Sequence, residues 1–94
     1  MTKLAADAAT QEKVRGGGIQ ALFRQHLNES LAKYYLTDRE FAVVLELVSG
    51  KTYAGIAEGL FITERTVKFH CQNIYGKLGV SNRREFMQLI DELL

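Results

Sequence analysis

Between residues 63 and 78, apolar and polar positions alternate with the period of an amphipathic helix. The apolar positions recur at spacings of i, i+4, i+7 and i+11: Val67, Cys71, Ile74 and Leu78. The opposite side carries cationic, amide and aromatic groups without a carboxylate: Arg65, Lys68, Phe69, Gln72, Asn73 and Gly76. Thr63 is placed to cap the start of this helix, and Gly79 to end it. The pattern predicts a helix that rests on a core with one side and suits a DNA major groove with the other.

A second helical pattern covers residues 19–35. Its repeated positions fall on one face: Ile19, Leu22, Phe23, His26, Leu27, Leu31 and Tyr34. This face must be covered by the rest of the domain, by a second subunit or by a missing partner, and we favour the first two. His26 is expected to be a packed residue at the core edge and not a metal ligand, because no second ligating side chain stands at a suitable spacing.

Two helices are predicted between these segments. The sequence Thr37-Asp38-Arg39-Glu40 has the form of a capping box, in which the threonine and the glutamate satisfy each other's backbone amides. The helix that it starts ends at Ser49-Gly50 and directs four residues inward: Phe41, Val44, Leu45 and Val48. Thr52 then caps a short helix from Tyr53 to about Leu60. Its inward residues are Ile56, Ala57 and Leu60, and Phe61-Ile62 forms the turn before Thr63.

A last helix begins at Ser81-Asn82-Arg83-Arg84-Glu85, where Asn82 and Glu85 have the spacing of a second, less regular capping box. It carries a long apolar stripe: Phe86, Leu89, Ile90, Leu93 and Leu94. This stripe is more apolar than a small core requires. It therefore predicts that part of the helix covers the core and part meets a second subunit, and these five residues are the candidate dimer interface.

Residues 1–18 are rich in alanine and small polar residues and end in Arg15-Gly16-Gly17-Gly18. Consecutive glycines lose too much backbone entropy to be favoured in a helix. The segment is expected to be a tail or a linker. As a linker, the segment would connect this domain to another part of a larger protein. The alternative is a plain disordered terminus.

Composition and charge narrow the function class. The chain has 94 residues, 47% of them hydrophobic, which fits one small globular domain. Its net charge is only +1, but residues 63–84 hold five cations and one carboxylate, a local charge of +4 against −3 elsewhere. The single cysteine cannot form an intrachain disulfide. Neither a membrane span nor a signal peptide is recognisable, so a cytoplasmic location is expected.

The assembled motifs resemble a known family. They run Leu36-Thr37-x-Arg39-Glu40, Gly50, Ile56-Ala57, Leu60, Ile62-Thr63-x-x-Thr66-Val67-Lys68-x-His70, Ile74 and Lys77-Leu78-Gly79-Val80-x-x-Arg83. This series resembles the LuxR-type helix-turn-helix domain of bacterial response regulators and quorum sensors. The resemblance covers roughly residues 36–93 and implies an all-α fold, with a four-helix bundle over residues 36–94. It further implies transcriptional regulation and binding of a dimer to a two-fold DNA site. It implies nothing about residues 1–35, where the extra helix at 19–35 is predicted from its own apolar pattern.

The resemblance, together with the exposed face of residues 63–78, gives candidate contacts with DNA. The base contacts are Lys68, Phe69 and Gln72, the aromatic ring being suited to a thymine methyl group unless it packs on Arg65 or a neighbouring helix. The contacts with the DNA backbone are Thr52, Tyr53, Thr63, Arg65, Thr66, Asn73 and Lys77. Arg83 is expected to pair within the domain, with a carboxylate such as Glu40. The sequence departs from the family pattern at Asp38, Gly55 and Gly76, and the last lowers helix stability.

Other functions are disfavoured. His70 and Cys71 invite a catalytic reading, but adjacent helix residues diverge by about 100°, and no third member of a triad accompanies them. We therefore expect no enzyme, and no metal, cofactor, small-molecule substrate or membrane contact. The alternative is a protein-interaction module that docks on RNA polymerase or another regulator through the apolar helices at 19–35 and 83–94. The absence of carboxylates from the exposed face of residues 63–78 favours DNA binding over protein docking. DNA phosphates would repel carboxylates there, whereas a protein-docking surface has no need to exclude them.

Overall fold

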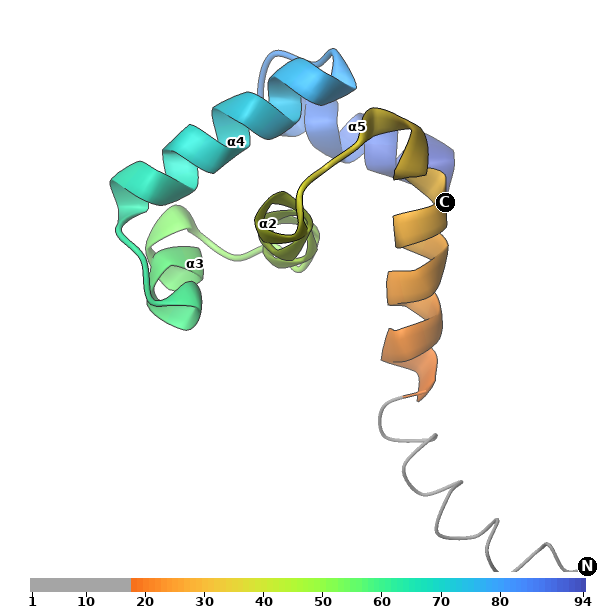
Figure 1. The fold of residues 1–94 in the computed structure, drawn as a ribbon, viewed down its shortest axis with the longest axis horizontal. Coiled ribbons are helices and arrows are strands. Elements are labelled where there is room, and N and C mark those ends of the chain that lie inside the picture. The colour runs from red at the N-terminus through yellow and green to blue at the C-terminus, as the bar shows by residue number, and fades with distance from the viewer. Residues whose placement is uncertain (1–17) are drawn as a thin grey trace, which may run out of the picture.

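A computed structural model describes residues 18–94, and every regular element among them is helical. A helix over residues 18–30 leads into the short 3-10 helix η1 (Ala32–Tyr34). The helices α2 (Asp38–Val48), α3 (Tyr53–Leu60), α4 (Glu64–Leu78) and α5 (Arg83–Leu93) follow (Figure 1). The all-α prediction is confirmed, as is the four-helix bundle with one extra helix before it. The predicted tail or linker lies outside the described residues except for Gly18, which begins the first helix.

The first helix is shorter than the predicted range of 19–35. It ends at residue 30, and the chain then turns through η1 to Tyr35, whose φ of 56° and ψ of 49° are left-handed. A left-handed residue cannot continue an α-helix, so the direction of the chain changes there. We call residues 18–30 the N-terminal helix and residues 31–37 the junction. The junction connects the N-terminal helix to α2.

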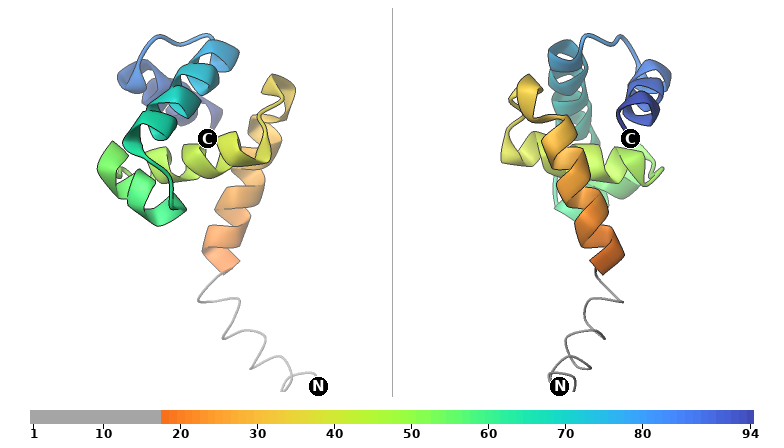
Figure 2. Two further views of the ribbon diagram at one scale, coloured as in Figure 1. Left: turned by 60° about the vertical axis from the view of Figure 1, so that its left-hand side comes forward. Right: turned by 90° about the vertical axis from the view of Figure 1, so that its right-hand side faces the viewer.

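Helix α2 lies at the centre of the bundle. Figure 1 shows it end-on, with α3 and α4 on one side and the N-terminal helix on the other, and Figure 2 shows the same arrangement from two further directions. Because α2 is covered on two sides, it buries more than one stripe. Val43, Val44 and Leu47 are completely buried, whereas Phe41, Leu45 and Val48 are half-buried. All four residues predicted to point inward therefore belong to the core or pack against it, but the prediction missed Val43 and Leu47.

The four main helices begin at side-chain caps, as the sequence predicts. The Thr37 hydroxyl accepts from the Glu40 amide at 3.1 Å, and the Glu40 carboxylate accepts from the Thr37 amide at 2.9 Å, which completes the capping box. Thr52, Thr63 and Asn82 cap the other helices. The second box differs from the prediction, because the Glu85 carboxylate accepts from the Ser81 amide at 2.8 Å, one residue before the cap.

The N-terminal helix is buried at one end and exposed at the other. Leu27 and Leu31 are 0% and 2% exposed and belong to the core, which confirms that this helix packs on its own domain. Ile19 and Leu22, nearer its start, are 75% and 67% exposed. The prediction for His26 was wrong: its side chain is exposed, because the buried face runs through positions 27 and 31 and His26 lies about 100° around the helix from Leu27.

Helix α5 gives most of its apolar stripe to the core of its own chain. Phe86 and Ile90 are 0% and 2% exposed, and the rings of Tyr75 and Phe86 lie 5.8 Å apart. Their assignment to a dimer interface is therefore corrected, since a buried side chain cannot meet a second subunit. Leu89 and Leu93 are half-buried, and Leu94 is exposed. Only these three of the five predicted interface residues still have accessible surface.

Candidate nucleic-acid interface

Helix α4 has the two sides that the sequence predicts. Its buried side packs on the core through Val67, Cys71, Ile74, Tyr75 and Leu78. Its outer side exposes Arg65, Lys68, Phe69, Gln72, Asn73 and Gly76. Glu64 is the one carboxylate of α4 and lies in its first turn, where it suits the positive end of the helix dipole. The exposed face beyond this first turn offers hydrogen-bond donors, cations and an aromatic ring.

A tight turn sets α4 at an angle to α3. Phe61, between them, has a φ of 60° and is 94% exposed, and the Ile62 amide donates to the Ala57 carbonyl at 3.0 Å. This is the 6→1 hydrogen bond that closes a helix C-terminus in the Schellman motif. Helix α3, before the turn, packs on α4, which follows it. The pair forms a helix-turn-helix, with α4 as the outer, longer member.

The threonines at the helix starts are occupied as caps. The Thr52 hydroxyl accepts from the Gly55 amide at 3.0 Å, and the Thr63 hydroxyl accepts from the Thr66 amide at 3.1 Å. The Thr63 and Thr66 hydroxyls also lie 3.0 Å apart and share a hydrogen bond. Thr52 retains a hydroxyl proton that a phosphate could accept, whereas one of the two hydroxyl protons of Thr63 and Thr66 is used in their shared hydrogen bond. Their assignment as contacts with the DNA backbone remains a prediction.

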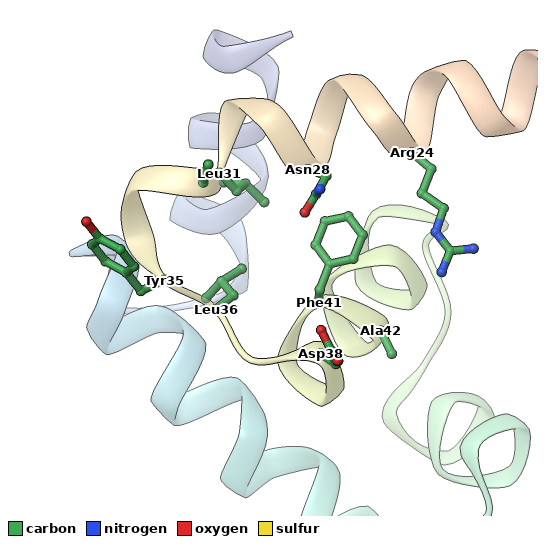
Figure 3. Close-up of a pocket in the computed structure, with 9 residues that line it drawn as sticks. Arg24, Asn28, Leu31, Tyr35, Leu36, Asp38, Phe41 and Ala42 are labelled. Carbon is green, nitrogen blue, oxygen red and sulfur yellow. The ribbon is translucent and has the colours of Figure 1, made fainter.

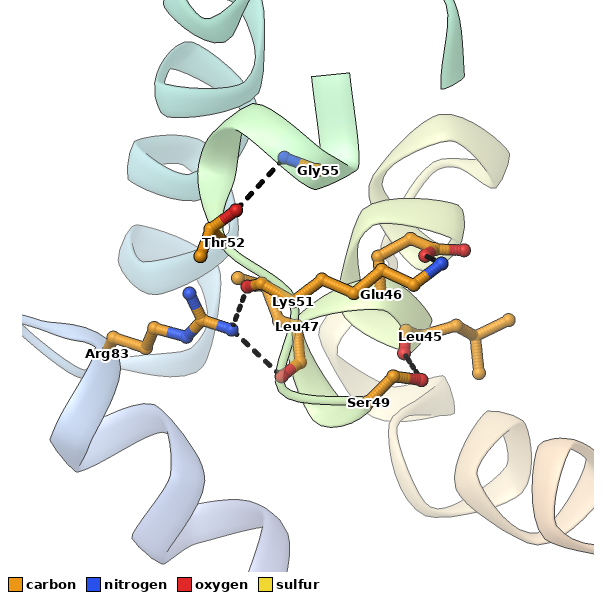
Figure 4. A network of polar contacts seen from close by, with 8 residues as sticks. All are labelled: Leu45, Glu46, Leu47, Ser49, Lys51, Thr52, Gly55 and Arg83. Atoms are coloured by element: carbon orange, nitrogen blue, oxygen red, sulfur yellow. Dashed lines mark hydrogen bonds and ion pairs between the residues drawn. The ribbon is translucent and has the colours of Figure 1, made fainter. Parts of the chain in front are cut away.

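Arg83 binds groups of its own domain, as expected, but its partner differs from the predicted Glu40. Its guanidinium donates to the carbonyls of Leu47 at 3.1 Å and Lys51 at 2.6 Å (Figure 4). It also lies 5.7 Å from the centre of the Tyr53 ring. It therefore fixes the turn between α2 and α3. Glu40 is not its partner, because Glu40 lies at the start of α2 and Arg83 reaches its end. Every residue carries a backbone carbonyl, so the sequence does not show which carbonyls accept from Arg83.

Lys77 is also engaged within the domain. Its ammonium donates to the Glu40 carboxylate at 2.6 Å and to the Tyr35 carbonyl at 3.1 Å. Burial alone raises the pKa of Glu40, but the hydrogen bonds from Lys77 and Thr37 and the charge of Lys77 outweigh it and lower the pKa. Two of the three N–H donors of the Lys77 ammonium are therefore used within its own chain, and the assignment of Lys77 to the DNA backbone remains a prediction.

Phe69 stands outward on α4 and is 59% exposed. Its ring meets the edge of the neighbouring His70 ring, with centroids 5.8 Å apart. An aromatic side chain that remains exposed on a helix surface has apolar area available for a partner. This geometry agrees with the proposed base contact better than with packing on a neighbouring helix.

The buried side of α4 holds the single cysteine of the chain. Cys71 is 2% exposed, and burial raises the pKa of its thiol, which disfavours the reactive thiolate.

Within the described part of the chain, no group of three His, Cys, Asp or Glu side chains could hold a metal ion. Among residues 18–94, no helix has the length and hydropathy that crossing a membrane requires.

Gly76 weakens α4 and can be tested separately from DNA binding. A Cβ atom at this exposed position would meet nothing within 4 Å. Gly76→Ala is therefore expected to raise the free energy of unfolding by about 0.5–1 kcal/mol, since glycine loses more backbone entropy in a helix. Gly79→Ala, at a φ of +75°, is the matched control and should destabilise the domain. Urea unfolding measures both, and a loss of stability in Gly76→Ala would contradict the prediction.

Comparison with known proteins supports the assignment from geometry. Residues 34–90 match the family model described as bacterial regulatory proteins, luxR family. The chain is 46% identical over 67 residues to the transcriptional activator protein EsaR of Pantoea stewartii subsp. stewartii, covering 71% of this chain and 27% of that protein. It is 40% identical over 75 residues to the transcriptional regulatory protein LiaR of Bacillus subtilis, covering 80% of this chain and 35% of that protein.

A third relative is the nitrate/nitrite response regulator protein homolog of Haemophilus influenzae, 36% identical over 75 residues, covering 80% of this chain and 36% of that protein. The chain thus spans no more than about a third of the length of these relatives. No solved structure matches the chain significantly.

Proposed function

Because the chain belongs to the luxR family of bacterial regulatory proteins, with its DNA-binding domain at residues 34–90, we propose that it reads a specific sequence in double-stranded DNA and regulates transcription there. The observation that carries the proposal is the outer face of α4. Cationic, amide and aromatic side chains are exposed on it, while the opposite face is buried in the core. The exposed face of such a helix can enter a major groove while the opposite face stays packed on the core.

The exposed side chains divide by chemistry into two groups. Lys68, Phe69 and Gln72 are the proposed base contacts: a lysine donates to guanine O6 and N7, a glutamine pairs with adenine, and an aromatic ring meets a thymine methyl group. The proposed contacts with the DNA backbone are Arg65 and Asn73 on α4, the threonines Thr52, Thr63 and Thr66, and Tyr53. Tyr53 is half-buried and stacked with Arg83, so it is the most restricted of this second group.

We further propose that two copies bind a two-fold symmetric site. The two-fold symmetry of such DNA sites matches that of a protein dimer, and the spacing of the half-sites follows from the dimer geometry. The α5 surface left for this contact consists of Leu89, Leu93 and Leu94, where the first two are half-buried and the third is 48% exposed. Such a contact is small, so association should become measurable chiefly on DNA. A cytoplasmic location, where bacterial DNA resides, belongs to the same proposal.

Selection from a randomised duplex pool at two salt concentrations tests the function. Enrichment of a two-fold symmetric sequence, with affinity falling steeply as salt rises, is the expected result. If a folded sample enriches no sequence and its retention does not depend on salt, the proposal fails. The chain would then act as a protein-interaction module, with RNA polymerase or another regulator as the partner to examine.

Lys68→Ala separates base reading from phosphate attraction. On the selected site this change should weaken binding by about 1–3 kcal/mol, with a much smaller loss on random duplex, because a lost base contact affects only the preferred sequence. Arg65→Ala is the control on the same helix face. It should weaken both duplexes alike and reduce the slope of log affinity against log salt by about 1. Equal losses on both duplexes for Lys68→Ala would show that Lys68 does not read bases.

A further inference from the structure

Lys77 connects three parts of the chain that are distant in sequence. It lies in the last turn of α4, and its ammonium donates to the Tyr35 carbonyl and to the Glu40 carboxylate at the start of α2. The same Glu40 oxygen accepts from the Thr37 amide. Of the two charged side chains, that of Glu40 is 7% exposed and that of Lys77 is 34% exposed. One side chain of the DNA-reading helix therefore holds the start of α2 and the junction together.

The junction has a conformation that needs such support. Tyr35 is left-handed without being a glycine, and its side chain is 83% exposed, so side-chain packing contributes little to holding it. Its amide donates to the Ala32 carbonyl at 3.2 Å, and its carbonyl accepts from Lys77. These two hydrogen bonds to the Tyr35 backbone, one from its own turn and one from the Lys77 side chain, fix the direction in which the N-terminal helix leaves the domain.

The N-terminal helix is held mainly at this end. Leu27 and Leu31 are buried, whereas an open groove of about 380 Å³ runs between the helix and α2. Figure 3 shows Asn28 and Phe41 facing each other across this groove. A second groove of about 470 Å³, lined by Ile19, Phe23 and Leu45 among others, continues toward the start of the helix. The 380 Å³ groove reaches into the junction, because Leu31, Ala32, Tyr35 and Leu36 also line it. The buried leucines and the hydrogen bonds of Lys77 are therefore the contacts that hold this end of the helix.

We propose that Lys77 is a positioning residue that couples the docking of the N-terminal helix to α4. In this role it does not contact phosphate. Its charge stays on Glu40 and Tyr35 when DNA is bound, so the junction remains closed in the complex. Because coupling between two events is reciprocal, a closed junction favours the reading position of α4, and bound DNA favours the closed junction. The DNA half of this statement rests on the proposed function, whereas the junction half does not.

Hydrogen exchange of the free protein tests the junction half. Lys77→Met removes both hydrogen bonds, and amide protection over residues 27–37 should fall by about tenfold or more, beyond any fall at Val67, Ile74 and Phe86 in the core. Lys68→Met, which removes a cation exposed on the outer face of α4, is the control and should leave the junction unchanged. Lys77→Arg keeps the charge and the donors and should restore most of the protection. An equal fall at all positions, or none at 27–37, would overturn the proposal.

The wild-type protein on its selected DNA tests the other half and does not depend on whether a variant folds. Protection over residues 27–37 should rise on binding, because Lys77 keeps its internal partners and bound DNA favours the closed junction. Unchanged protection would show that the two are not coupled and would overturn the proposal. A fall would mean that phosphate withdraws Lys77 from Tyr35, and the proposal would fail. In parallel, Lys77→Met should leave the salt slope unchanged, in contrast to the unit reduction for Arg65→Ala. If the chain binds no DNA, the proposed function fails, while the exchange of the free protein still decides the role of Lys77.

Discussion

Replacing Phe86 by alanine is expected to lower the free energy of unfolding by about 3–5 kcal/mol, the largest effect of any single change considered for this protein. Phe86 is 0% exposed, and its ring packs beside that of Tyr75, so α5 is attached to α4 through it. Its removal leaves a cavity that the small bundle can only partly close. Urea unfolding, monitored by circular dichroism, measures the loss.

The concentration dependence of that loss distinguishes core from interface. If Phe86 contributes within one chain, the destabilisation is the same at every protein concentration, whereas loss of a dimer contact changes with concentration. Leu94→Ala, at the residue that follows α5 directly, is the control, because Leu94 is 48% exposed. It should change stability by no more than about 0.5 kcal/mol, as surface substitutions usually do. A concentration-dependent effect for Phe86→Ala would restore its assignment to a subunit contact.

Glu40→Ala is expected to cost about 3 kcal/mol, because it breaks an ion pair whose carboxylate is 7% exposed, leaves Lys77 without its counterion and removes one half of the α2 capping box. Glu46→Ala is a matched control on the same helix. Glu46 pairs with Lys51 at 2.5 Å, but the two side chains are 25% and 48% exposed. Solvent screens such a pair, so its loss should cost no more than about 1 kcal/mol. Similar losses for the two variants would show that the Glu40 pair contributes no more than a surface contact.

The contribution of Glu40 should also depend on pH with a definite sign. Its pKa is lowered in the folded protein from the ordinary 4.5, so the unfolded chain binds its proton more readily. Stability from this group is therefore complete above the ordinary pKa and is lost as pH falls through the lower folded value. The difference in unfolding free energy between wild type and Glu40→Ala should accordingly be constant near neutral pH and shrink below pH 4.5. A difference that grew on acidification would contradict the internal pairing.

The sequence by itself determined the local features of this protein. Thr37, Thr52, Thr63 and Asn82 cap the helices that they were predicted to cap, and the left-handed Gly79 ends α4. The two faces of α4 were also predictable. Caps and helix faces involve residues within about four positions of each other, so spacing alone specifies them. The candidate reading face could therefore be named before the fold was known.

Only the tertiary structure decided how the helices share their surfaces. Phe86 and Ile90 belong to the core, α2 buries two sides, Lys77 pairs with Glu40, and Arg83 binds the carbonyls of Leu47 and Lys51. These hydrogen bonds of Lys77 and Arg83 join residues 32 to 37 positions apart, and their geometry depends on how whole helices pack. A stripe of apolar residues shows that a face will be covered, but it does not show which element covers it. A lysine or arginine in the sequence likewise indicates that a hydrogen-bond acceptor is needed. The packing of the bundle determines which carboxylate or carbonyl oxygen lies close enough to accept.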